Sequence, residues 1–114
     1  MMPKYLVQIS YTAEGTRGLM SEGGTKRRDA IETLLSSMGA KLEAFYYSLG
    51  DQDLVAIVDA ATHVDLSSVL LRVMASGTAT TKTTCLLTPQ EMDWATQTTV
   101  PYKAPGAEES TLRP

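Results

Sequence analysis

The sequence predicts a small α+β domain with the element order strand, helix, strand, strand, helix, strand. Two observations carry this prediction. Four short segments carry apolar residues either at every second position or in an unbroken run, as strands do. Two longer segments between them place apolar residues at spacings of three and four, which is typical of helices with one buried side. The length of 114 residues fits one domain.

The first half of the chain is expected to supply two strands and a helix. Large side chains alternate between two faces along Lys4–Tyr11, which predicts the first strand. Ala13–Ser21 predicts a short helix or turn that ends at a double glycine. Thr25 then caps the first amphipathic helix, whose apolar stripe includes Ile31. Lys41–Leu49, rich in aromatic and apolar residues, predicts the second strand.

The second half repeats this order. Leu54–Val58 is a short apolar run that forms a hairpin with the preceding strand. Val64–Met74 carries the second amphipathic stripe, and the threonine-rich segment Thr78–Leu87 suits a fourth strand. Thr88-Pro89-Gln90-Glu91 has the pattern of a capping box and predicts a short last helix. We expect residues 1–96 to form the domain and 97–114, with three prolines, an extended or disordered tail.

This order of elements predicts a ferredoxin-like fold, in which a four-stranded antiparallel sheet carries both helices on one face. The other face of the sheet would then be bare. Because the central strands carry apolar residues on both faces, a bare face would expose more apolar surface than monomers tolerate. We therefore expect a homodimer in which two copies pack face to face.

The composition argues against several classes of partner. A formal net charge of −3 disfavours nucleic acid, whose binding relies on clustered Lys and Arg. The basic run Lys26-Arg27-Arg28 is typical of a solvated helix face. Cys85 is the single cysteine, so it allows no internal disulfide and is expected to pack in a strand as a small apolar residue. Without a signal core or an apolar run of membrane-spanning length, the sequence predicts a cytoplasmic protein with no membrane partner.

Five segments, spread over nearly the whole chain, match a known family in order and spacing. They are KYLVQISYTAEG (4–15), EGGTKRR (22–28), GAKLEAFYYSLGDQDLVAIVD (39–59), ASGTATTKTTCLLTPQEMD (75–93) and YKAPG (102–106). Together they resemble the GYD-domain family of small bacterial proteins. The resemblance implies a dimeric α+β barrel and implies no particular reaction. The Gly-Tyr-Asp element that names the family falls at the hairpin, where this chain reads Gly50-Asp51-Gln52-Asp53, so no role of that tyrosine is transferred.

No cofactor and no metal ion are predicted. A glycine fingerprint for flavin or nicotinamide dinucleotides is missing, since Glu22-Gly23-Gly24 does not follow a strand in the required way. His63 is the only histidine, so a haem would have to use it as the axial ligand. One histidine also leaves a metal site short of its preferred ligand. An exposed loop position is the simpler interpretation of His63.

Candidate site residues follow from the alternation of the strands. If the first strand packs Val7 under the helices, a second set of side chains points to the opposite face, towards the dimer interior. This set includes Gln8, Ser10, Glu43, Tyr47 and Lys82. A slip of one residue would exchange the faces and place Tyr11 and Tyr46 in the cavity instead. Lys82 and Glu43 can also simply pair with each other or reach solvent.

Arg27 offers a separate possibility. At a helix start beside two glycines, its guanidinium and the backbone amides can hold a carboxylate or a phosphate.

The leading functional hypothesis is a homo-oligomeric domain that binds a small organic ligand in a cavity between sheet and helices. One alternative is a cofactor-independent enzyme, of the monooxygenase or isomerase type, with Lys82, Tyr47 or His63 as the proton-transfer group. Another alternative is an oligomerising interaction module, in which the dimer interface and the tail around Tyr102 engage neighbouring subunits.

Overall fold

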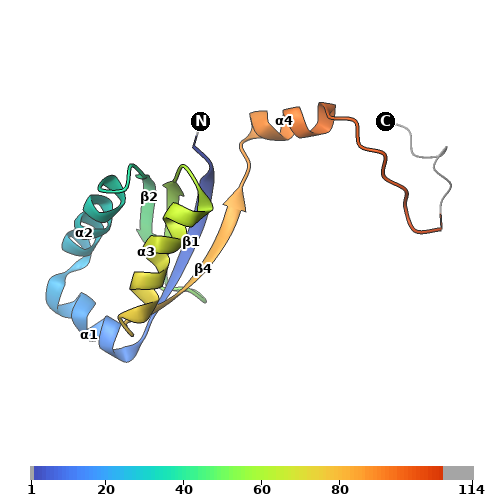
Figure 1. Ribbon diagram of the computed structural model, residues 1–114. Helices are drawn as coiled ribbons and strands as arrows, with labels where there is room; N and C mark the ends of the chain where they lie inside the picture. The colour runs from blue at the N-terminus through green and yellow to red at the C-terminus, as the bar shows by residue number, and fades with distance from the viewer. Residues whose placement is uncertain (1, 107–114) are drawn as a thin grey trace.

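The structure is a computed structural model that describes residues 2–106. Residues 107–114 of the predicted tail lie outside the described residues. In chain order, the elements are β1 (Lys4–Tyr11), α1 (Ala13–Glu22), α2 (Gly24–Ser36), β2 (Lys41–Tyr47), β3 (Leu54–Asp59), α3 (His63–Ala75), β4 (Ala79–Leu86) and α4 (Pro89–Gln97) (Figure 1). None of the helices within the described residues is long and apolar enough to cross a membrane.

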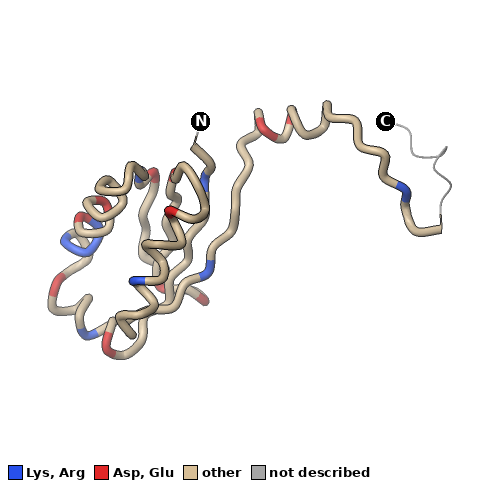
Figure 2. Tube along the Cα trace, in the orientation of Figure 1, with Lys and Arg blue, Asp and Glu red and all other residues tan. Residues whose placement is uncertain are grey.

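The four strands form one antiparallel sheet in the order β2-β3-β1-β4. Because β3 lies between β1 and β2, and β1 lies between β3 and β4, two split β-α-β units interlock. Helices α1, α2 and α3 lie on one side of this sheet (Figure 1). Charged residues of both signs are spread over these helices (Figure 2). The predicted α+β fold is confirmed, and the strand order is consistent with the ferredoxin-like arrangement.

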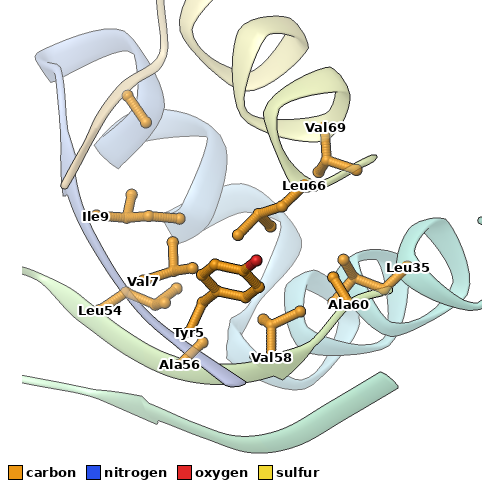
Figure 3. Packing of buried hydrophobic residues seen from close by; sticks show 11 residues of the cluster. Tyr5, Val7, Ile9, Leu35, Leu54, Ala56, Val58, Ala60, Leu66 and Val69 are labelled. Atoms are coloured by element: carbon orange, nitrogen blue, oxygen red, sulfur yellow. The ribbon is translucent and has the colours of Figure 1, made fainter. Parts of the chain in front are cut away.

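The core lies between the helices and the two central strands (Figure 3). Alternate residues of β1 and β3 point towards the helices, where they meet buried side chains of α2 and α3. These buried residues are Tyr5, Val7, Ile9, Leu35, Leu54, Ala56, Val58, Ala60, Leu66, Val69 and Ala79. Leu54 is only 1% exposed. The predicted burial of Val7 under the helices is therefore confirmed.

An irregularity in β2 changes which of its side chains face the helices. Leu42 and Ala44 pair with consecutive residues of β3, so that Glu43 is an extra residue in the strand. Such a β-bulge places two residues opposite one and reverses the alternation beyond it. As a result, Tyr46 points to the open face, whereas Tyr47 turns to the helix side, where it meets α2. The prediction that Tyr47 lies on the open face was wrong.

Two glycine-dependent features fix the start of the helical layer. Gly23, with φ of +91°, terminates α1 and directly precedes α2. Only glycine adopts such a backbone conformation without strain. Helix α2 therefore begins at Gly24, and the prediction that Thr25 caps it was wrong. Gly15, in the first turn of α1, lies against the α3–β4 loop so closely that an added Cβ would be 2.0 Å from Thr78 O. The first turn of α1 therefore lies directly against the loop that joins α3 to β4.

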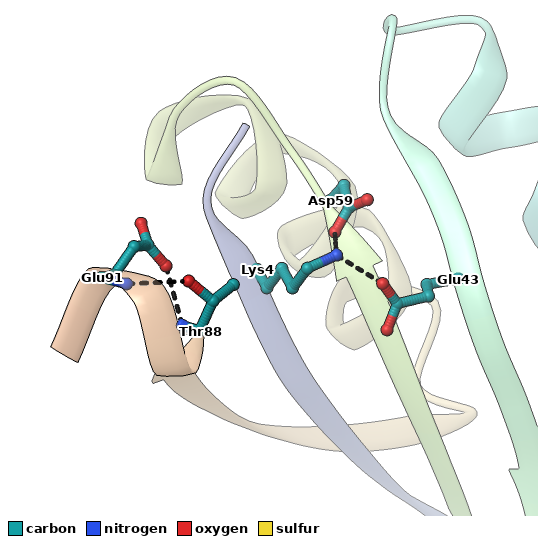
Figure 4. A network of polar contacts seen from close by, with 5 residues as sticks. All are labelled: Lys4, Glu43, Asp59, Thr88 and Glu91. Atoms are coloured by element: carbon teal, nitrogen blue, oxygen red, sulfur yellow. Dashed lines mark hydrogen bonds and ion pairs between the residues drawn. The ribbon is translucent and has the colours of Figure 1, made fainter. Parts of the chain in front are cut away.

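The chain leaves the sheet through α4. As predicted, a capping box starts this helix: Thr88 Oγ1 accepts from Glu91 N at 3.1 Å, and Glu91 Oε1 accepts from Thr88 N at 2.8 Å (Figure 4). Helix α4 lies beyond the end of the sheet, away from the other helices (Figure 1), and none of its residues is buried. Residues 98–106 form neither helix nor strand. We call residues 87–106 the arm.

Candidate functional site

A cleft of about 370 Å³ lies between α2 and α3, above β1 and the start of β4. Its floor is apolar, and its rim carries two guanidinium groups and three hydroxyl groups. The floor is formed by Ile9, Ala30, Ile31, Leu34, Val73 and Ala79, and the rim by Tyr11, Arg27, Arg72, Ser76 and Thr78. A small, mainly apolar hollow with a few convergent polar groups is the usual form of a small-molecule site, and the volume is in the ordinary range.

Arg27 enters the cleft from the first turn of α2. Its Nε atom is buried and lies 3.1 Å from Glu22 Oε1, at the end of α1. The N–H bond is not aligned with this carboxylate, and Nε has no hydrogen-bond acceptor within the described residues. Because Nε is buried against Glu22, a ligand in the cleft would meet the terminal nitrogens of Arg27, whose side chain is 37% exposed.

Arg72 faces Arg27 across the cleft, from the last turn of α3. Its Nη1 donates to the carbonyl oxygen of Ser68 at 3.0 Å, which fixes the side chain along its own helix. Next to it, the hydroxyl groups of Ser76 and Thr78 lie 2.6 Å apart. The rim therefore combines cationic and hydroxyl groups from the start of α2 and from the end of α3 with the loop that follows it.

Two tyrosines stand beside Arg27. Burial raises the pKa of the Tyr11 phenol above its ordinary value; Tyr47 adds to this effect, and Arg27 opposes it. Burial likewise raises the pKa of Tyr47, whose hydroxyl donates to Gly24 O at 2.9 Å. Both phenols thus stay protonated at neutral pH; the O–H of Tyr47 is used by Gly24 O, and that of Tyr11 is available to a ligand.

The sequence profile of the GYD domain matches residues 5–96, from β1 to the last turn of α4. The chain belongs to the GYD domain family. No curated protein and no solved structure matches the sequence. The match contains every residue of the cleft.

In this GYD domain, the sequence-predicted site residues do not all lie on one face of the sheet. Tyr11 and Arg27 line the cleft, with Tyr47 beside them. Five more belong to the open face, Gln8, Ser10, Glu43, Tyr46 and Lys82, and His63 lies outside the sheet at the start of α3. Arg72 was not predicted as a site residue. The one feature of the sequence that could have drawn attention to it is that it is the single arginine or lysine of α3, in the last turn.

On the open face, the polar residues mostly pair with one another. Lys4 Nζ lies 2.9 Å from Asp59 Oδ1 and is also bonded to Glu43 (Figure 4). Hydrogen bonds to Glu43 first, and then to Asp59, raise the pKa of Lys4. Of the two alternatives given for Lys82 and Glu43, a mutual pair or exposure to solvent, the structure shows no mutual pair: Glu43 pairs with Lys4, and Lys82 is exposed on the edge strand β4.

The three proposed proton-transfer residues of the GYD domain do not meet. Lys82 lies on the open side of the sheet and Tyr47 on the helix side. His63 is the exposed first residue of α3, whereas Arg72 lies in the last turn of that helix. At a rise of about 1.5 Å per residue, His63 and Arg72 are roughly 14 Å apart along the helix axis. Within residues 2–106, no three His, Cys, Asp or Glu side chains are grouped as a metal site requires.

Cys85 also departs from its predicted position. Its side chain is exposed, because it lies near the end of β4, at the edge of the sheet, beyond the residues that α3 covers.

Proposed function

We propose that this GYD domain is a binding module that takes up a small organic anion in the cleft between α2 and α3. The observation that carries the proposal is the apolar floor edged by two arginines. Apolar walls provide affinity by burial, and a few fixed donors provide orientation.

The geometry favours a carboxylate with an apolar body. The body would pack on Ile31, Leu34 and Val73, and the carboxylate would accept hydrogen bonds from Arg27 and Arg72. Guanidinium groups match carboxylates because their donors form a planar fork. Glu22 already offsets part of the charge of Arg27, so a singly charged carboxylate suits the rim better than a doubly charged phosphate.

The proposed module is a homodimer. The open face carries a strip of partly exposed aliphatic side chains, Leu6, Val55 and Ile57, which are neighbours in the β1–β3 register. Beside this strip, Tyr46 is 71% exposed. Apolar residues grouped on one face of a sheet favour a protein partner, and a second copy of the chain is the partner that is always present.

Binding of octanoate, followed by amide chemical shifts on ¹⁵N-labelled protein, tests the cleft. We expect shifts in α2 and α3, and Arg27→Gln or Arg72→Gln should each weaken binding about 10-fold or more, as loss of a charged hydrogen bond does. Arg28→Gln is the matched control, because Arg28 pairs with Asp29 at 3.0 Å and does not line the cleft. Equal effects of Arg27→Gln and Arg28→Gln, or equal affinity for 1-octanol, would rule out the proposed anion site.

A further inference from the structure

The arm is unusually apolar for a segment that packs on nothing in its own chain. Five of its large side chains are between 48% and 69% exposed: Leu87, Met92, Trp94, Val100 and Tyr102. Its charged residues within the described part are only Glu91, Asp93 and Lys103 (Figure 2). A segment exposed to solvent usually has more charged side chains than large apolar ones.

Helix α4 is too short to be stable by itself. It has nine residues and no buried side chain. Isolated helices below about 12–15 residues are marginal in water, and a cap contributes only about 1 kcal/mol. Packing on another surface is what usually stabilises a helix of this length.

The arm does not lie on the apolar strip of its own sheet (Figure 1). Helix α4 starts two residues after the end of β4, and the capping box fixes that junction. From there the chain continues away from the sheet (Figure 1), and the longest dimension of the molecule reaches 62 Å, against 29 and 23 Å for the other two. The strip of Leu6, Val55 and Ile57 thus remains uncovered within one chain.

We propose that the arm of each chain lies on the open sheet face of a second copy, in a reciprocal pair. This inference rests on the proposed homodimer and names the segment that holds it together. Each copy carries both an arm and an uncovered face, so mutual exchange closes the assembly around a two-fold axis.

The available area is sufficient for a stable pair. Aromatic side chains such as Trp94 and Tyr102 bury about 150–250 Å² each when fully covered. On that scale, the five half-exposed side chains of one arm offer on the order of 500 Å². Two arms, together with the two faces that they cover, exceed the roughly 1,000 Å² that a specific interface requires.

Trp94→Glu, studied by sedimentation velocity over a dilution series, is the first test. We expect the dissociation constant of the dimer to rise about 30-fold or more, as it does when a buried aromatic anchor is lost. Met20→Glu is the matched control, because Met20 is 81% exposed but belongs to α1. A Trp94→Glu variant with an unchanged dissociation constant would overturn the inference.

Truncation tests the role of the arm independently of whether a homodimer exists. A chain that ends at Leu86, the last residue of β4, should be monomeric, whereas a chain that ends at Gly106 should dimerise like the full chain. Two dimeric truncations would overturn the role of the arm and leave the homodimer standing. A full chain that is monomeric throughout, or that forms assemblies larger than a pair, would overturn the reciprocal exchange. Octanoate binding to the cleft is measured independently of all these outcomes.

Trp94 is the only tryptophan of the chain, so its fluorescence reports the environment of the arm. We expect blue-shifted emission in the dimer and a red shift on dilution. Ile57→Glu, which places a charge in the open-face strip, should cause the same red shift without dilution. Val64→Glu, at an exposed position on α3, is the control. Unchanged emission in Ile57→Glu would show that the arm does not lie on that face.

Discussion

The two faces of the sheet are built from the same strands yet differ in composition. On the helix side, β1 and β3 contribute aliphatic and aromatic side chains, such as Val7 and Leu54, and all of these except Tyr11 are buried. On the open side, the aliphatic strip is surrounded by polar residues that pair with each other, such as Lys4 and Asp59. The difference indicates that the helix side supplies most of the stability of the fold, and it agrees with the proposal that the open side binds a second copy.

Truncation of a core residue should give the largest contrast between the faces. Leu54→Ala is expected to lower the free energy of unfolding by about 2–5 kcal/mol, through lost burial and a cavity. Its neighbour Val55, on the open face, is only partly buried, so Val55→Ala should cost about 1 kcal/mol. Urea denaturation of dilute protein measures both values. Equal losses would contradict the assignment of stability to the helix side.

The contact of α1 with the α3–β4 loop predicts the next largest effect. Gly15→Ala should destabilise the protein by roughly 1–3 kcal/mol, because the new Cβ would overlap with Thr78 O. Gly18→Ala, in the same helix with no atom within 4 Å of the new Cβ, should instead stabilise it by about 0.5–1 kcal/mol. Thermal unfolding distinguishes the two. A stabilising Gly15→Ala would disprove the close approach.

Two adjacent tyrosines beyond the β2 bulge provide a smaller, matched comparison. Tyr47→Phe removes the hydrogen bond to Gly24 O and should cost about 0.5–1 kcal/mol. Tyr46→Phe, on the open face, has no such bond to lose within the described residues and should leave the free energy of unfolding of the monomer nearly unchanged. If Tyr46→Phe proved the more costly change, the bulge would be misplaced.

The smallest effect is expected at alkaline pH. Since the pKa of Tyr11 is higher in the folded state than its ordinary value of about 10, its contribution to stability is present below pH 10 and is lost as the pH rises through the folded pKa. Tyr11→Phe should therefore reduce the fall in the free energy of unfolding above pH 10. The comparison at pH 7 gives the baseline, and identical pH profiles above pH 10 would contradict the raised pKa.

Most of the fold could be predicted from local patterns. The bounds of β1 were predicted correctly because its alternation is regular, and the capping box at Thr88 was predicted because its residue types are specific. The orientation of Tyr47 was not predictable, because the bulge at Glu43 leaves no mark in the residue types. A single extra residue was enough to move a candidate site residue to the other side of the sheet.

The cleft itself was beyond sequence reasoning. Arg27 was recognised for its place at a helix start, but Arg72 comes from the other helical unit, and only the packing of both helices on β1 brings the two together. Similarly, His63 was predicted in a loop, whereas the cap formed by Thr62 makes it the first residue of α3. Contacts between distant segments are not encoded in local spacing.

The position of β4 at the edge of the sheet has a consequence for solubility. An edge strand offers unpaired backbone groups to any other strand, and eight residues rich in threonine make a good template for fibril-like stacking. Lys82, in the middle of this strand, is its only charged residue. A charge at such a position hinders the approach of an identical strand. We therefore expect Lys82 to hinder precipitation of the protein at high concentration. A test of binding or catalysis would not detect this effect.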